Sequence, residues 1–144
     1  MTRWAIADTG PLVAYFDDRD GRHEWAVTQF STLYRPLLVS EPVLTEALFL
    51  LRRSSEGSDA IMDLLERDVM RVGFDLGDQL AEVRALMRKY RDVPMSLADA
   101  CIVRMSELHR DHLVLTLDSD FSVYRRFGRE PIPLITPGIP QNGH

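Results

Sequence analysis

Five short apolar runs, none longer than five residues, limit what this chain of 144 residues can fold into. They are WAIA (4–7), LLVS (37–40), VMRVG (69–73), LVLTL (113–117) and IPLI (132–135). Between them, apolar residues recur at helical spacing, so we interpret the runs as buried strands and the intervening segments as helices. Strands that alternate with helices favour a parallel sheet covered on both faces. The sequence therefore predicts an α/β fold.

The helical segments carry their own start signals. Pro11 falls in the first turn of a helix that opens at residue 9, and Ser40 caps a helix that we expect to run to residue 53. The other helices are predicted over 26–34, 60–65, 78–91 and 96–110. Residues 1–136 are expected to form a single domain. Prolines and glycines with little to bury predict a frayed tail over 137–144.

The overall composition indicates a cytoplasmic protein without a membrane segment. No apolar run approaches the ~20 residues that span a bilayer, and the N-terminus has no signal-peptide pattern. The single cysteine, Cys101, rules out an internal disulfide and fits a reducing compartment. A net charge of −5 argues against nucleic-acid binding, but 16 of the 17 basic residues are arginines. Arginine favours phosphate recognition, although codon bias would explain the same skew.

Four acidic residues stand where a parallel sheet binds its ligands, beyond the carboxyl ends of the strands near a switch in strand order. Asp8 directly follows the first apolar run, and Asp118 directly follows the fourth. Asp99 lies in the first turn of the helix before the fourth run. Glu46 lies two turns into the helix after residues 37–40, about 9 Å from its cap. The fold could gather all four at one end of the sheet.

Each acid also has a purely structural explanation. Asp8 or Thr9 could cap the following helix, Ser96 and Asp99 resemble a capping box, and Asp118 with Asp120 could form an Asx-turn. Glu46 could be a solvated helix residue. Its neighbours are almost unbroken apolar residues, however, and a carboxylate buried there would need a cation or hydrogen-bond donors.

If these acids converge, their mutual repulsion requires a positive charge between them. Oxygen ligands without His or Cys favour Mg²⁺ or Mn²⁺ over zinc. Such ions commonly assist the hydrolysis of phosphodiesters. The acidic set therefore indicates metal-assisted phosphodiester chemistry.

Four segments in this order resemble the PIN domain, and more narrowly the VapC-type ribonuclease toxins of bacterial toxin–antitoxin pairs. They are ADTGPLVAYFD with Asp8, EPVLTEALFLL with Glu46, SLADACIV with Asp99 and VLTLDSDF with Asp118. The resemblance covers nearly the whole chain. It implies a three-layer α/β/α sandwich with a five-stranded parallel sheet, and an endoribonuclease that depends on Mg²⁺ or Mn²⁺.

Carried over to this sequence, the resemblance implies that Asp8, Glu46, Asp99 and Asp118 form a catalytic quartet. Asp8, Asp99 and Asp118 would hold the metal, and Asp120 is the second candidate for the last acid. Thr116 would fill the accessory role that a Ser or Thr has in family members. Water would attack an RNA phosphodiester in line, with a carboxylate orienting or deprotonating it.

Substrate and partner contacts are expected elsewhere on the surface. The candidate RNA-binding arginines are Arg52, Arg53, Arg125, Arg126 and Arg129, with a solvated rim as the alternative explanation. The apolar faces of the second and third helices exceed what one thin sheet needs, which suggests a homodimer or an antitoxin-binding groove. The resemblance implies the same partners.

Other classes account for the sequence less well. A haloacid-dehalogenase-like phosphatase needs a second Asp two residues after Asp8, where this chain has Gly10. A response-regulator receiver needs an acidic pair near the first strand and a late lysine, and neither is evident. Two alternatives remain open: a PIN-like module that binds RNA or protein without cleavage, and a nuclease of RNA maturation or turnover without an antitoxin.

Overall fold

The structure is a computed structural model that describes residues 3–137. Of the predicted tail, all but Pro137 lies outside these residues. No helix within the described range is long and apolar enough to cross a membrane.

A five-stranded sheet forms the centre of the molecule, as predicted. Its strands are β1 (Ala5–Ala7), β2 (Leu37–Val39), β3 (Met70–Val72), β4 (Leu113–Leu115) and β7 (Leu134–Ile135). All four pairings are parallel, in the order β3-β2-β1-β4-β7. Every predicted apolar run contains one of these strands. The strands are shorter than the runs, because the polar or turn-forming ends of the runs lie outside the hydrogen-bonded ladder.

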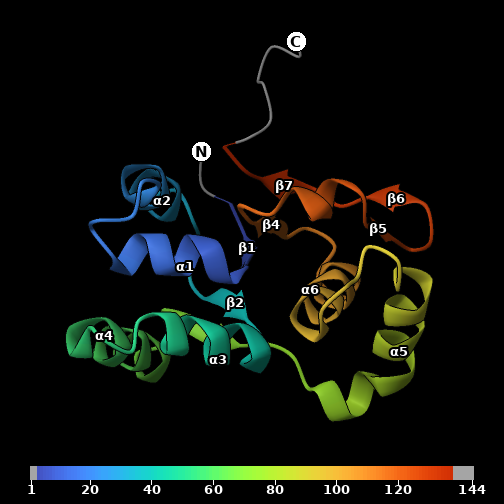
Figure 1. Cartoon of the computed structure of the whole chain (residues 1–144), viewed down its shortest axis with the longest axis horizontal. Coiled ribbons are helices and arrows are strands. Elements are labelled where there is room, and N and C mark those ends of the chain that lie inside the picture. The colour runs from blue at the N-terminus through green and yellow to red at the C-terminus, as the bar shows by residue number, and fades with distance from the viewer. Residues whose placement is uncertain (1–2, 138–144) are drawn as a thin grey trace.

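Helices cover both faces of this sheet, so the three-layer α/β/α prediction is confirmed. They are α1 (Thr9–Phe16), α2 (His23–Phe30), α3 (Glu41–Leu50), α4 (Ser55–Glu66), α5 (Leu80–Lys89) and α6 (Leu97–Leu108). Figure 1 shows α1 to α4 gathered on one side of the strands and α5 and α6 on the other. Two 3₁₀ turns, η1 (Leu76–Gln79) and η2 (Ser119–Ser122), complete the helical elements.

Several predicted helix boundaries need correction. The second helix begins at His23 rather than at residue 26, and α4 spans Ser55–Glu66 rather than 60–65. The second helix ends at Phe30, so Leu33 and Tyr34 lie beyond it, and the third ends at Leu50 rather than at Arg53. A short antiparallel hairpin, β5 (Arg125–Arg126) with β6 (Glu130–Pro131), was not predicted. Its strands have two residues each and carry charges, so they lack the apolar pattern on which strand prediction depends.

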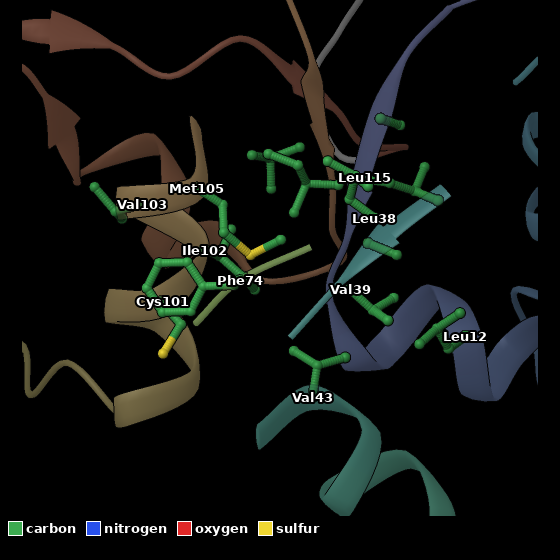
Figure 2. Packing of buried hydrophobic residues seen from close by; sticks show 14 of the residues in the cluster. Leu12, Leu38, Val39, Val43, Phe74, Cys101, Ile102, Val103, Met105 and Leu115 are labelled. Carbon is green, nitrogen blue, oxygen red and sulfur yellow. The ribbon is translucent and has the colours of Figure 1, made fainter. Parts of the chain in front are cut away.

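The core lies between the sheet and the two helical layers. Leu12 from α1 and Val43 from α3 reach the strands from one side, and Ile102 and Met105 from α6 reach them from the other (Figure 2). The sheet is only three residues deep, and all three residues of β1 are fully buried. The strands next to the switch point are mostly buried, whereas Arg71 and Val72 of the edge strand β3 are exposed. The loops at the strand ends are therefore left to carry the polar groups of the switch point.

The strand order reverses at β1. The chain proceeds from β1 through β2 to β3 on one side, then crosses back to place β4 and β7 on the other side. Adjacent β1 and β4 thus flank the switch point, where parallel sheets bind ligands. Asp8 and Asp118 follow these two strands.

Candidate functional site

A cleft of about 520 Å³ opens at this switch point and contains every acid that the sequence singled out. Within the described part of the chain, no basic residue lines it. Its five carboxylates are those of Asp8, Glu46, Asp99, Asp118 and Asp120. They come from the ends of β1 and β4, the middle of α3 and the first turn of α6. The predicted convergence of remote acids is therefore a property of the fold.

Asp8 is held from two sides. One carboxylate oxygen, Oδ1, accepts the backbone N–H of Thr9 at 2.8 Å and caps α1, and Oδ2 accepts the Thr116 hydroxyl at 2.8 Å. Thr116 is fully buried, and its Oγ1 also accepts the backbone N–H of Asp118 at 2.9 Å. Thr116 thus joins the first acid to the last, although 108 residues separate it from Asp8.

Asp99 is held by a residue that sequence reasoning missed. The hydroxyl of Tyr124 donates to Oδ2 of Asp99 at 2.8 Å, and the Tyr124 ring is fully buried against Tyr90 and Phe121. Ser96 caps α6, as predicted, by accepting the N–H of Asp99 at 3.0 Å. A buried tyrosine hydroxyl needs a partner, but nothing in the sequence indicates which group it will meet.

The remaining acids lie at the solvent side of the cleft. Glu46 is exposed, because α3 turns Val43, Leu44 and Ala47 inward and leaves Glu46 on the opposite face. Of the two possibilities for Glu46, the structure shows the solvated helix residue, and this exposed side chain also lines the cleft. Asp118 forms the predicted Asx-turn by accepting the N–H of Asp120 at 2.9 Å.

Local capping and membership of the cleft coexist at Asp8 and Asp118. An ionised carboxylate offers about four lone-pair positions, so one or two local hydrogen bonds leave room for further donors or a cation. The structural and the functional explanations of these acids were posed as alternatives, and the structure combines them.

The electrostatics of the cleft favour a cation. Burial raises the pKa of Asp8 to about 6, and the charges of Asp99 and Asp118 add to this, while hydrogen bonds from Thr116 and Thr9 oppose it. Burial also raises the pKa of Asp99, opposed by Tyr124 and Ser96 and reinforced by Asp118. Two neighbouring carboxyls that resist ionisation indicate a site where negative charge is not compensated by the protein.

The donor set suits a hard divalent ion. All five side chains offer oxygen, and none of the lining residues is His or Cys. Among residues 3–137, no three His, Cys, Asp or Glu side chains form a ready-made ligand group.

Gly10 allows the two sides of the cleft to approach closely. A Cβ atom added at Gly10 would lie 3.2 Å from Cδ1 of Leu117, tighter than an ordinary contact. The first turn of α1 therefore packs directly on the residue before Asp118. This close packing brings the acid after β1 next to the acid after β4.

The predicted RNA-binding arginines fall into three situations. Arg126 is buried, pairs with Glu130 and donates to the backbone oxygen of Ser106 at 2.9 Å, so its guanidinium is used inside the protein. Arg125 donates to three carbonyls of its own turn.

Arg52, Arg53 and Arg129 are exposed. The Arg52 guanidinium covers the Phe49 ring at 4.0 Å from its centroid. Arg53 lines a separate cavity that borders the acidic cleft at Leu50. For Arg126 the expectation of RNA contact needs correction, because burial and internal hydrogen bonds occupy its side chain.

The arrangement defines a class of protein. A sequence model of the PIN domain matches residues 5–126, and the chain belongs to the PIN-domain family.

Within that family the chain is related to VapC ribonucleases. It is 30% identical over 128 residues to ribonuclease VapC26 of Mycobacterium tuberculosis, covering 85% of this chain and 93% of that protein. The resemblance inferred from the four acidic segments is thereby confirmed.

Two solved structures share the fold. One is M. tuberculosis VapC20, described as a toxin that cleaves the sarcin–ricin loop, with a TM-score of 0.73 and 21% identity over 83% of this chain and 93% of that one. The other is a toxin–antitoxin complex from Klebsiella pneumoniae, with a TM-score of 0.63 and 21% identity over 82% of this chain and 90% of that one.

Proposed function

We propose that this protein is a divalent-metal-dependent endoribonuclease and the toxin of a toxin–antitoxin pair. The observation that carries the proposal is the cleft at the switch point, where five carboxylates from separate elements meet without a basic residue. Relationship to a VapC ribonuclease supports RNA as the substrate.

Asp8, Asp99 and Asp118 would hold the ion, which we expect to be Mg²⁺ or Mn²⁺. Between Asp118 and Asp120 we favour Asp118, because its charge acts on both Asp8 and Asp99, whereas that of Asp120 is felt at Tyr124. When bound, such an ion would polarise the phosphoryl oxygen and lower the pKa of water.

The chain's own side chains would organise the reaction. Thr116 and Tyr124 each bind one oxygen of Asp8 and Asp99, respectively, which fixes the orientation of both carboxylates. Glu46 has no hydrogen-bond partner within residues 3–137 and lies at the open side of the cleft. It is therefore free to orient the attacking water or to accept its proton.

The antitoxin would occupy a groove between α1, α2 and α4. Apart from Ser31, Arg35 and Arg67, this groove of about 380 Å³ is lined by apolar and aromatic side chains, among them Leu12, Phe16 and Phe30. Arg67 already pairs with Asp63, so Arg35 is the arginine of the groove that is left for a partner. Such a groove suits a partner helix that carries apolar residues and an acid near Arg35. The Klebsiella complex among the structural neighbours supports an antitoxin partner.

We also propose a homodimer, and a cytoplasmic site of action. The third helix leaves Phe49 58% and Leu50 52% exposed, and Val27 on the second helix is 43% exposed, which favours self-association of this protein. Light scattering that finds a strict monomer across micromolar concentrations would contradict the dimer.

Cleavage of a labelled structured RNA tests the central proposal. Metal-stripped protein should be inactive and should regain cleavage on addition of Mg²⁺ or Mn²⁺. Wild-type protein that binds the RNA but cleaves it with neither ion would instead favour a PIN-like binding module. Cleavage by a protein that has no partner encoded beside it would favour an RNA turnover enzyme.

A further inference from the structure

A second surface depression continues from the catalytic cleft toward α5. The cleft shares Glu46 and Ser96 with a neighbouring hollow of about 780 Å³, and that hollow shares Leu76 and Leu97 with a third one of about 490 Å³ along α5. The three hollows therefore form one continuous path from the acids, past the first turn of α6, to the outer face of α5.

The far end of this path, which we call the α5 furrow, is defined by Arg84, Arg88 and Arg91 together with Leu80 and Leu97. No acidic residue lines it in the described part of the chain. The three arginines recur at intervals of four and three, so they lie along one side of the helix and its last turn, over about 10 Å. They form a row of positive charge on an apolar floor.

These arginines are exposed, and none has an ion-pair or hydrogen-bond partner for its side chain within residues 3–137. Several other arginines differ in this respect: Arg67 and Arg71 pair with nearby acids, and Arg104 and Arg126 bind internal groups. Three uncompensated guanidinium groups side by side repel one another. Because no acid of the described chain pairs with them, all three are available to an incoming anion, and the planar guanidinium group suits phosphate in particular.

The other flank of the catalytic cleft lacks this character. There the cavity that borders it at Leu50 is lined by both signs of charge, with Asp17, Asp18 and Glu56 beside Arg19 and Arg53. The hollow between the cleft and α5 carries Glu41 and Glu46, so the attraction for a polyanion is confined to the far end of the path, where the lining holds three arginines and no acid.

We propose that the α5 furrow binds the sugar–phosphate backbone of the RNA that flanks the cleaved bond. Arg84, Arg88 and Arg91 contact phosphates, and the apolar floor at Leu80 and Leu97 receives ribose or base surfaces. This inference rests on the proposed ribonuclease activity and adds a binding track to it. A second copy of the chain fits the furrow less well, because a twofold contact would bring like charges together.

The test uses the full-length protein and two triple variants. Arg84→Gln/Arg88→Gln/Arg91→Gln removes the row, and Arg19→Gln/Arg22→Gln/Arg71→Gln removes the same charge from exposed positions elsewhere. Binding of a fluorescent 20-nucleotide single-stranded RNA and of an RNA hairpin is followed by anisotropy in EDTA, so that no cleavage intervenes. Cleavage rates with Mg²⁺ and Mn²⁺ are measured in parallel.

We expect the furrow variant to bind RNA at least tenfold more weakly than wild type at low salt. The slope of log K against log salt concentration should become shallower by about 2, since each lost phosphate contact on a single strand accounts for about 0.7. The control variant should bind within twofold of wild type. Cleavage by the furrow variant should show a raised KM and an unchanged kcat.

The possible outcomes separate this inference from the proposed function. Equal RNA affinity of the two triple variants, or no RNA binding by wild type at low salt, overturns the furrow. Weakened binding by the furrow variant without cleavage by wild type supports the furrow and contradicts the nuclease. A loss of dimer in the furrow variant by light scattering, with RNA affinity unchanged, would assign the surface to a second copy.

Discussion

The two walls of the acidic cleft differ in how firmly they are built. On the inner wall, Asp8 and Asp99 each accept a hydrogen bond from a fully buried hydroxyl, Thr116 or Tyr124. On the outer wall, Glu46 and Asp118 are exposed, and only Asp118 has a local backbone donor. The contrast indicates that the inner wall sets geometry, while the outer wall can adapt to substrate.

The inner wall is also the part of the site where the ionised carboxylates are least stable. Burial of Asp8 and Asp99 raises the pKa of each carboxyl, so their ionised forms are disfavoured until a cation arrives. The inner wall thus holds two rigid carboxylates with raised pKa values, and the outer wall holds two solvated ones. Such a combination suits a site that must recruit an ion and still release product. Substitutions on each wall, and the dependence of stability on pH, test this difference between the two walls.

The largest effect is expected from the inner wall. Asp99→Asn or Asp8→Asn should reduce metal-dependent RNA cleavage by at least about a thousandfold, because ion binding and water activation are lost together. The rate of cleavage of labelled RNA measures this, with folding checked by circular dichroism. Asp92→Asn, an exposed acid outside the cleft, is the matched control. Full activity of Asp99→Asn after metal stripping and replenishment would reject the inner wall as the ion site.

The second prediction concerns stability against pH in the metal-free protein. The folded-state pKa of Asp8 is about 6, above its ordinary value of 3.8, so the folded protein holds a proton that the unfolded chain has released. Stability should therefore fall as pH rises from about 4 to 6 and remain low above that range. The difference corresponds to about 3 kcal/mol at pH 7.

Urea unfolding in EDTA of wild type and Asp8→Asn isolates this contribution, because the other carboxyls cancel in the comparison. The two proteins should be nearly equal in stability at pH 4, and Asp8→Asn should be the more stable at pH 7. A difference that does not change with pH would show that Asp8 ionises freely.

The third prediction tests the hydroxyl that holds Asp99. Tyr124→Phe keeps the buried ring and removes only the hydrogen bond to Oδ2, so we expect the Mn²⁺ concentration for half-maximal activity to rise about 10- to 100-fold. Saturating Mn²⁺ should restore most of the rate.

Tyr90→Phe is the matched control for this variant. It removes the hydroxyl of the neighbouring ring, which accepts the N–H of Arg125 and does not touch Asp99. If both variants change stability alike and neither changes the Mn²⁺ dependence, Tyr124 acts only in packing.

The smallest effects are expected from substitutions on the outer wall. They also test whether Asp118 or Asp120 is the last acid of the site. Asp118→Asn should slow cleavage clearly, because the charge of Asp118 acts on both Asp8 and Asp99. Asp120→Asn should change the rate by no more than about threefold, since its charge is not among those that act on these two carboxyls. Steady-state cleavage at 0.15 M salt measures both. The reverse ranking would assign the last acid to Asp120.

Much of this architecture follows from local sequence patterns. The strands carry compact apolar runs, and the helices carry caps such as Ser40 and Ser96 that the structure uses as expected. The switch-point rule places Asp8 and Asp118 at the site from the sequence alone, because each directly follows an apolar run of the sequence.

What escaped prediction depends on tertiary contacts. Tyr124 lies in a loop with no periodic pattern, and only folding brings its hydroxyl to Asp99. Arg126 was expected on the surface because arginine usually is, yet the hairpin turns it inward to Glu130 and Ser106. The helical spacing of the α5 arginines is visible in the sequence. Their proximity to the cleft depends on the fold and is not.

The bond between Thr116 and Asp8 has a consequence for synthesis of the chain. Because it joins residues 108 positions apart, the inner wall can form only after most of the described chain has been synthesised. A nascent chain that stops before Thr116 lacks the hydroxyl that orients Asp8, and it also lacks Asp118 and Tyr124. Assembly of the cleft is therefore a late event in synthesis, well after the first strand has emerged.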